Sequence, residues 1–419
     1  MSNSGPIGRV VIIGAGQAGI EAAGALRMNG YTQEVVVVGE EQGLPYSRPP
    51  LSKGFLTGEL DESMLALRTQ DQLVDQGIKL LSGHQVTEIN RGSGQVLLDD
   101  GSSLAYDQLV IASGGTPRQL GTPELAAAGN VFSLRTLGDA EKLKGYLKPG
   151  TKAVIIGGGY IGLEIASAAK SAGVGVTVLE AAPRVLARVT SPVMSDFFQR
   201  LHAEEGVEIV LNAQVERFLT TETGDISAVQ LAGGRTVEAD FVLVGIGLIP
   251  RTELAEAAGL EVDNGIVVDE GLRTSDPRVY AIGDVARHPD PQHGGFRRLE
   301  SAPNASEQAR CVAASILGDF RAYSALPWFW SIQYDVKLQV AGLAQGYDNI
   351  VVRGDAESGR RVTVLYLRED ILIAADVVNL PAEFAACKRL ISAQAPLDPA
   401  RLNDLNIPLK DCIAAKVPV

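Results

Sequence analysis

Two short stretches decide the fold, VVIIGAGQAG at residues 10–19 and AVIIGGGYIG at residues 153–162. In each, a β-branched apolar run of strand character leads into G-x-G-x-x-G, and an alanine-rich helical segment follows. A strand, a tight glycine turn and a helix form the unit that binds the pyrophosphate of a dinucleotide. Two such units predict an α/β protein with two Rossmann-like dinucleotide-binding domains.

The glycines of each motif have separate physical tasks. The first permits the tight turn, the second lets the backbone approach a pyrophosphate, and the third lets the helix pack on the strand. The N-terminus of the helix then faces the phosphates with its positive end. In this order the glycines are Gly14, Gly16 and Gly19 in the first copy, and Gly157, Gly159 and Gly162 in the second.

An acidic residue ends the next predicted strand after each motif. Glu40 follows the apolar run 34–39, and Glu180 follows the run 174–179. A carboxylate at this point accepts hydrogen bonds from ribose hydroxyls and disfavours a ribose 2′-phosphate. A glycine-rich turn without a ligand is the alternative for one copy alone, and the repetition of turn and acid argues against it.

Composition and charge exclude several classes of protein. The chain has 419 residues and a net charge of −13, which disfavours nucleic acid and anionic membranes as general partners. We find no apolar run long enough to span a bilayer and no signal-peptide pattern, so we expect a cytoplasmic protein. The three cysteines and four histidines lack metal-ligand spacing, so no metal site is expected.

Two further segments are typical of a flavoprotein. Residues 109–115 read LVIASGG, a strand that runs into small residues, and residues 279–284 read VYAIGD. We expect a helix after Asp284, whose carboxylate can accept a bond from a ribityl hydroxyl while the helix N-terminus faces phosphate. The alternative is that Asp284 only caps that helix.

Three motifs beyond the fingerprints narrow the family. They are RPPLSK at residues 48–53, PWFWS at 327–331 and LQVAGL at 338–343. Together with the fingerprints they resemble the FAD-containing ferredoxin reductases of bacterial cytochrome P450 and aromatic-ring dioxygenase systems. The resemblance covers essentially the whole chain and implies the glutathione-reductase-like fold, with FAD and NADH as cofactors.

The resemblance also implies a domain layout. Residues 1–115 and 245–325 form a discontinuous FAD-binding domain, in which Glu40 holds the adenosine ribose of FAD. Residues 116–244 form the NAD-binding domain, in which Glu180 holds the ribose of NADH and favours it over NADPH. Arg184 is the residue that could instead contact a 2′-phosphate. Residues 326–419, where short strands alternate before a helix at about 382–393, form a C-terminal α+β domain.

Lys53 and Glu164 are the leading candidates for catalysis. In the family that this chain resembles, the matching lysine and glutamate form an ion pair beside the flavin N5 atom. Such a pair steadies the changes of charge and proton position at N5 while a hydride is transferred. A buried ion pair with only a structural role is the alternative.

The resemblance assigns three more residues to the flavin site. Arg48 and Arg135 match cofactor-binding arginines, and Trp330 matches an aromatic residue close to the isoalloxazine ring, with both a cofactor-binding and a catalytic role. A surface arginine and plain core packing are the alternatives for Arg135 and Trp330. One position departs from the family pattern: Ile332 stands where an aspartate is usual, which predicts a less polar flavin edge.

No cysteine pair follows the first fingerprint, so electrons must leave the flavin directly. The implied acceptor is a [2Fe–2S] ferredoxin, which needs a local basic patch because the chain as a whole is acidic. The candidates are Arg310, Lys388, Arg389 and Lys410, with Arg297 and Arg298 nearby in sequence. Solvated surface charge is the alternative for any one of them.

The resulting hypothesis is a monomeric flavoprotein that passes electrons from NADH through FAD to a ferredoxin that feeds a P450 monooxygenase or a ring-hydroxylating dioxygenase. A rubredoxin reductase or another NADH-dependent flavoenzyme is one alternative. A redox-responsive binding protein similar to apoptosis-inducing factor is the other. Rapid reoxidation of the reduced flavin by a ferredoxin distinguishes the first hypothesis from the last.

Overall fold

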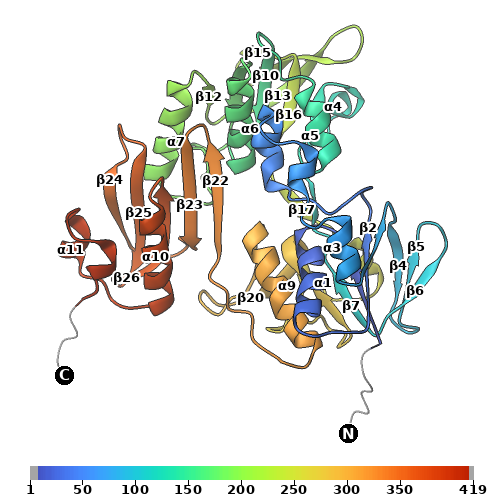
Figure 1. The fold of residues 1–419 in the computed structure, drawn as a ribbon. Coiled ribbons are helices and arrows are strands. Elements are labelled where there is room, and N and C mark those ends of the chain that lie inside the picture. The colour runs from blue at the N-terminus through green and yellow to red at the C-terminus, as the bar shows by residue number, and fades with distance from the viewer. Residues whose placement is uncertain (1–7, 415–419) are drawn as a thin grey trace. The chain divides into compact units, whose positions relative to one another are not determined.

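A computed structural model describes residues 8–414 and divides the chain into two compact units (Figure 1). The first unit comprises Met1–Pro49, Asp61–Thr116 and Leu248–Ala325. The second comprises Pro50–Leu60, Pro117–Gly247 and Leu326–Val419. None of the helices within the described residues is long and apolar enough to cross a membrane.

The first unit is built on a parallel sheet with the strand order β19-β7-β1-β2-β3. Its strands are apolar runs because helices bury a parallel sheet on both faces. The order reverses between β1 and β7, and such a reversal is where open parallel sheets bind ligands. The strands are β1 (Arg9–Ile13), β2 (Glu34–Gly39), β3 (Ile78–Ser82), β7 (Gln108–Ile111) and β19 (Val279–Ala281).

Helices α1 (Gln17–Met28) and α9 (Ala302–Ile316) lie side by side in this unit although they are far apart in sequence (Figure 1). Both contribute alanine-rich faces to the same core. The smaller elements of the unit are η2 (Glu62–Leu65), α3 (Gln70–Asp75), α8 (Glu253–Ala257), η3 (Gly283–Val285), the β4 (Val86–Asn90), β5 (Gln95–Leu98) and β6 (Ser103–Ala105) sheet, the β18 (Ile266–Val267), β20 (Ala286–Pro289) and β21 (Phe296–Arg298) sheet, and the β8 (Gly115–Pro117) and β17 (Leu248–Pro250) pair.

The second unit repeats the parallel design, with the strand order β12-β11-β10-β16-β9. Here the order reverses between β10 and β16, next to the second fingerprint. The strands are β9 (Val131–Phe132), β10 (Lys152–Ile156), β11 (Gly175–Leu179), β12 (Glu208–Val210) and β16 (Phe241–Val244). The remaining elements are α4 (Pro123–Ala127), α5 (Leu137–Lys144), α6 (Tyr160–Ser171), α7 (Pro192–Glu204), and the antiparallel β13 (Val215–Thr220), β14 (Ile226–Leu231) and β15 (Thr236–Glu238).

The second unit also contains the C-terminal antiparallel sheet, with the order β22-β23-β26-β25-β24. Helix α10 packs on β23 and β26 and buries an apolar cluster that includes Phe384 and Leu390. The elements are β22 (Trp328–Gln333), β23 (Val336–Gly342), β24 (Asn349–Asp355), β25 (Arg361–Arg368), β26 (Ile371–Val378), α10 (Pro381–Ala393), α11 (Pro399–Asn403) and η4 (Leu409–Asp411). The strands and helix predicted here from the sequence are therefore present.

The segment Pro50–Leu60 belongs to the second unit, whereas the sequence analysis placed it in the FAD-binding part. It contains α2 (Gly54–Thr57) and most of η1 (Pro49–Ser52). Helix α2 packs against α5 and α6. This packing brings Lys53, the last residue of the RPPLSK motif, to the helix that follows the second fingerprint.

Candidate functional site

The first fingerprint loop joins β1 to α1 and requires glycine for steric reasons. Gly14 has a φ of +105°, and a Cβ there would lie 2.3 Å from the carbonyl oxygen of Ala112. A Cβ on Gly19 would lie 1.9 Å from the carbonyl oxygen of Gly14. At Gly16 a Cβ would meet no described atom within 4 Å, so open space faces the loop where a phosphate needs room.

The second fingerprint loop, between β10 and α6, has the same geometry. Gly157 has a φ of +111°, and its Cβ would lie 2.4 Å from the Gly245 carbonyl oxygen. A Cβ on Gly162 would lie 2.2 Å from the Gly157 carbonyl oxygen, while Gly159 faces open space among the described residues. Neither α1 nor α6 has a side-chain cap from the described residues. Both helix N-termini therefore offer backbone N–H groups to an anion, and both loops fit a dinucleotide pyrophosphate.

The acid that follows β2 is held by a residue that the sequence analysis missed. Glu40 has a side chain that is 54% exposed, and its Oε2 lies 2.5 Å from Nη1 of Arg251. Ser113 fixes the Arg251 backbone by donating a hydrogen bond of 2.8 Å to its carbonyl oxygen. No local pattern points to Arg251, because it lies 211 positions from Glu40 in the chain.

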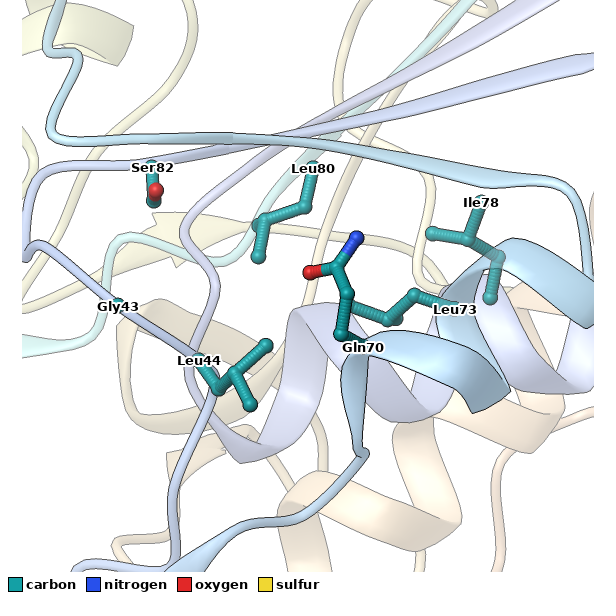
Figure 2. A pocket seen from close by; sticks show the side chains of 7 residues that line it. All are labelled: Gly43, Leu44, Gln70, Leu73, Ile78, Leu80 and Ser82. Atoms are coloured by element: carbon teal, nitrogen blue, oxygen red, sulfur yellow. The ribbon is translucent and has the colours of Figure 1, made fainter.

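A half-open pocket of about 230 Å³ lies beside the loop that follows Glu40. Figure 2 shows apolar side chains of β3 and the 40s loop together with the amide of Gln70. The lining contains no ionisable side chain, so the pocket offers space without acid–base chemistry of its own. Its residues are Gly43, Leu44, Gln70, Leu73, Ile78, Leu80 and Ser82.

The acid that follows β11 holds its own nucleotide loop. Glu180 Oε2 accepts a hydrogen bond of 2.6 Å from the Gly158 N–H, and Oε1 accepts one of 2.7 Å from the Ala182 N–H. Arg184 turns to the protein: its guanidinium donates to the carbonyl oxygen of Thr190 at 2.9 Å and to Ser195 Oγ at 2.7 Å. These contacts commit Arg184 to its own loop and weaken it as a ligand for a 2′-phosphate.

The helix expected after Asp284 is absent, so that part of the sequence analysis was wrong. A single 3₁₀ turn, η3, leads directly into β20, which pairs with β18 and β21. The helix that packs against this turn is α9 instead. Its buried Gln308 accepts a hydrogen bond of 2.7 Å from the Gly283 N–H. Asp284 is half-buried, and its carbonyl oxygen accepts from Arg298 at 3.0 Å.

The structure brings Lys53 and Glu164 together as a buried ion pair. Lys53 Nζ lies 2.6 Å from Glu164 Oε2, with side chains 14% and 4% exposed. Ser52 Oγ donates to the same oxygen at 2.5 Å. Ser331, which the sequence analysis did not assign, donates to Oε1 at 2.6 Å. Glu164 lies in the second turn of α6, because that helix begins at Tyr160. Several donors thus offset the cost of burying the carboxylate.

Strand β22 sorts its side chains to two faces. Ser331 and Gln333 point to the buried face, while Ile332 is 39% exposed on the other face, with Trp328 and Trp330. Ile332 therefore shares a face with Trp330, and the expectation of a less polar flavin edge stays a prediction. The rings of Trp328 and Trp330 lie 5.7 Å apart, and both side chains are partly exposed.

The two arginines assigned to cofactor binding are both half-buried. Arg48 Nη2 lies 2.5 Å from Glu41 Oε1, and its guanidinium stacks over the ring of Tyr46 at 5.4 Å. Arg135 precedes α5, and its N–H donates to Asp139 Oδ2 at 3.1 Å. These contacts fix the backbone and side-chain environment of each residue, and the assignments to cofactor binding stay predictions.

The basic residues assigned to docking lie at the surface of their own units. Arg310 is exposed on α9 and pairs with Glu307 at 2.5 Å. Arg389 and Lys410 are exposed in the C-terminal part of the second unit. Lys388 Nζ lies over the Trp328 ring at 5.3 Å. In the first unit Arg297 and Arg298 also pair with acids, Asp290 and Glu300.

Within residues 8–414, one group of metal-ligand type comes together, formed by His84, Asp99 and Asp100. It lies at the surface, where acidic groups of this kind are common without an ion, and we assign no metal to it. The three cysteines are free thiols. Burial raises the pKa of the Cys311 thiol to about 11, so this thiol stays protonated at neutral pH.

Known protein families and relatives match this protein along nearly the whole chain. Residues 8–309 match the family described as pyridine nucleotide-disulphide oxidoreductase, and residues 328–413 match the reductase C-terminal family. The chain is 46% identical to putidaredoxin reductase of Pseudomonas putida, over 97% of each chain. It is 44% identical to rhodocoxin reductase of Rhodococcus erythropolis, over 97% of this chain and 94% of the relative.

A solved structure gives the same result at the level of the fold. The crystal structure of the covalent putidaredoxin reductase–putidaredoxin complex matches with a TM-score of 0.94 and 45% identity, over 97% of this chain and 98% of that one. Relatives at 40–46% identity include enzymes named ferredoxin–NAD(P)⁺ reductases. The chain therefore belongs to the pyridine nucleotide-disulphide oxidoreductase family and, within it, is an FAD- and NAD(H)-dependent oxidoreductase of the ferredoxin reductase group.

Proposed function

We propose that this oxidoreductase takes electrons from NADH and passes them through FAD to a [2Fe–2S] ferredoxin of a P450 or ring-hydroxylating dioxygenase system. When bound, FAD accepts a hydride and releases the electrons one at a time. The observation that carries the proposal is the buried ion pair between Lys53, at the start of α2, and Glu164, on the helix that follows the second fingerprint. The names of relatives that are similar over almost their whole length support the ferredoxin as acceptor.

The two fingerprint motifs divide the proposed cofactor-binding residues into an FAD set and an NADH set. FAD would be held by the first unit, through its fingerprint glycines, Glu40, Arg48 and Asp284. NADH would be held by the parallel sheet of the second unit, through its fingerprint glycines and Glu180. Glu180 already accepts two backbone hydrogen bonds and keeps acceptor capacity for a ribose hydroxyl. Arg135 and Trp330 would complete the surroundings of the flavin.

Lys53 has the central role in the proposed reaction. Its ammonium group supplies a fixed positive charge in a largely buried position, where such a charge acts more strongly than in solvent. Glu164 keeps that ammonium in place and balances its charge. We therefore expect the pair to assist the hydride-transfer step more than the binding of NADH.

Stopped-flow reduction of the flavin by NADH tests this role. Lys53→Ala should lower the rate at saturating NADH by at least tenfold while the apparent Kd for NADH changes less than threefold, since about 1.4 kcal/mol of lost electrostatic stabilisation is tenfold in rate. Lys144→Ala is a matched control, because this lysine lies over the Phe55 ring at 4.9 Å in the same unit. Equal rates for Lys53→Ala and the unchanged protein would reject the assignment.

The choice of NADH over NADPH rests on Glu180 and on the contacts of Arg184. A carboxylate at the ribose disfavours a 2′-phosphate, and the Arg184 guanidinium is committed to Thr190 and Ser195. We expect kcat/KM for NADH to exceed that for NADPH by at least tenfold. Similar values for the two nucleotides would contradict the assignment.

The proposed ferredoxin contacts are Arg310 of the first unit and Lys388, Arg389 and Lys410 of the second. Because ferredoxins of these systems are acidic, exposed cations would raise the association rate at low salt. Arg310→Glu with Lys410→Glu should slow ferredoxin-dependent cytochrome c reduction and flatten its salt dependence, whereas Arg217→Glu should not. An unchanged rate at low salt would reject this docking surface.

The proposal also includes a monomeric enzyme. Sedimentation of the FAD-loaded protein at several concentrations tests this point.

A further inference from the structure

The Glu164 carboxylate is held from two sides. Lys53 and Ser52 donate to Oε2, as described above, and the Ser331 hydroxyl donates to Oε1 at 2.6 Å. A carboxylate that is held by one oxygen can still turn about its last side-chain bond. The bond from Ser331 blocks that rotation, so it fixes the direction from which Glu164 Oε2 meets the lysine.

The polar contacts continue behind Ser331. Gln333 Nε2 lies 3.1 Å from Ser331 Oγ, and Gln333 Oε1 lies 2.8 Å from His202 Nε2. On the other side of the imidazole, His202 Nδ1 lies 3.2 Å from Tyr334 Oη. Together these residues, which all belong to the second unit, form a chain of hydrogen bonds that ends on Glu164.

Chemistry fixes the direction of every bond in this chain. The only hydroxyl proton of Ser331 goes to Glu164, so Ser331 Oγ must accept from the Gln333 amide. The Gln333 carbonyl then faces His202, which must donate from Nε2 and accept from Tyr334 at Nδ1. Burial lowers the pKa of His202, which keeps the ring neutral as this arrangement requires. All donors thus point toward the carboxylate, and aligned hydrogen bonds of this kind reinforce one another.

Burying these polar side chains costs free energy, which indicates that they have a role. Ser331 and Gln333 are each 1% exposed, and His202 is fully buried. Strand β22 pairs with β23 through Ser331↔Leu338 and Gln333↔Val336, so backbone hydrogen bonds hold both side chains at fixed places. An apolar residue at either position would avoid the cost of burying a polar group.

We infer that Ser331, Gln333 and His202 are positioning residues for hydride transfer, which act by orienting Glu164 and, through it, Lys53. The inference rests on the proposed role of the Lys53–Glu164 pair. It assigns to the buried face of β22 a task that is separate from the role proposed for Trp330 on the opposite face. This series of hydrogen bonds is not a proton path, because the Gln333 amide does not relay protons.

Stopped-flow reduction by NADH tests the inference with the FAD-loaded enzyme. Ser331→Ala should lower the rate at saturating NADH about fivefold to tenfold, with the apparent Kd for NADH within twofold of its original value. Ser331→Thr keeps the hydroxyl and should recover most of the rate. Ser227→Ala is the matched control, because its hydroxyl donates to the carbonyl oxygen of Leu219 at 3.2 Å, away from Glu164. If Ser331→Ala does not retain FAD, Gln333→Met is measured in its place.

A double variant distinguishes positioning from a general structural effect. Once Glu164→Gln has removed the charge that Ser331 orients, Ser331→Ala should slow the reaction less than twofold further. An equal effect of Ser331→Ala with and without Glu164→Gln would overturn the inference, as would an unchanged rate while Lys53→Ala is slow. If Lys53→Ala itself has no effect, the proposed function of the pair fails first, and the inference fails with it.

Discussion

Among the described residues of the second unit, two buried carboxylates, Glu164 and Asp376, are stabilised in different ways. Glu164 is 4% exposed and pairs with the Lys53 ammonium. Asp376, on β26, is 2% exposed and accepts hydrogen bonds from the hydroxyls of Thr190 and Tyr366. Within residues 8–414 no cationic side chain forms an ion pair with Asp376. Glu164 is paired with a cation, whereas Asp376 is stabilised by hydrogen bonds from neutral hydroxyls.

The two carboxylates differ in their surroundings, and only Glu164 has a proposed role in the reaction. Burial raises the pKa of Asp376 to about 6, although the hydrogen bonds from Thr190 and Tyr366 act in the opposite direction. Through neutral donors, Asp376 joins the loop before α7 and strand β25 to β26, and we assign it a packing role. Glu164 holds Lys53 of the RPPLSK motif at a fixed and largely buried place, which suits the electrostatic role proposed for that lysine.

The largest expected effect comes from breaking the ion pair. Lys53→Met should lower the free energy of unfolding by about 3–5 kcal/mol, because it leaves Glu164 buried without its cation. Adding Glu164→Gln should recover much of that loss. Denaturant unfolding of the FAD-loaded proteins measures both. If Lys53→Met alone unfolded at the same denaturant concentration as the unchanged protein, the burial of Glu164 would not depend on its cation.

The next effect concerns pH and Asp376. The unfolded chain releases this proton near pH 4 and the folded protein near pH 6, so the folded state loses stability as pH rises between these values. The loss from this one group amounts to about 3 kcal/mol and persists above pH 6. Asp376→Asn should therefore gain stability relative to the unchanged protein across this window, as measured by unfolding at several pH values. Parallel pH profiles for the two proteins would contradict the raised pKa.

A smaller effect is expected from one of the donors to Asp376. Thr190→Val removes a hydroxyl that lowers the pKa of Asp376, so that pKa should rise further and the window of lost stability should extend to higher pH. The cost at neutral pH should be about 1.5–3 kcal/mol, as for a buried hydrogen bond to a charged group. Thr190→Ser, which keeps the hydroxyl, is the control. The same unfolding series measures both variants. Equal pH profiles for Thr190→Val and Thr190→Ser would show that the Thr190 hydroxyl does not affect the pKa of Asp376.

The smallest effect should come from the exposed counterpart in the first unit, Glu40 with Arg251. Their side chains are 54% and 32% exposed, so solvent screens the pair. Arg251→Ala should change the free energy of unfolding by less than about 1 kcal/mol. Denaturant unfolding with excess FAD measures it. A loss of stability as large as that of Lys53→Met would show that burial does not explain the difference between the two ion pairs.

Much of the fold could be predicted from the sequence because its constraints are local. At Gly14 and Gly157 the φ angles are +105° and +111°, which other residues rarely adopt, so the chain must carry glycine there whatever its surroundings. The acids Glu40 and Glu180 follow in the expected places at the ends of β2 and β11. The β-branched strands and the helix α10 were likewise readable from pattern alone.

The contacts that define the candidate site depended on tertiary structure. Ser331 reaches Glu164 across 167 positions and Ser52 reaches it across 112, and no spacing rule connects such residues. The alternation of β22 could have placed Ser331 opposite Trp330, although not against α6. Gln308 of α9 serves the Gly283 turn where the sequence predicted a helix. The sequence by itself thus determined both nucleotide-binding loops, because backbone sterics act within a few residues. Only the tertiary structure decided which side chains share a buried carboxylate, because that depends on strands and helices far apart in the chain.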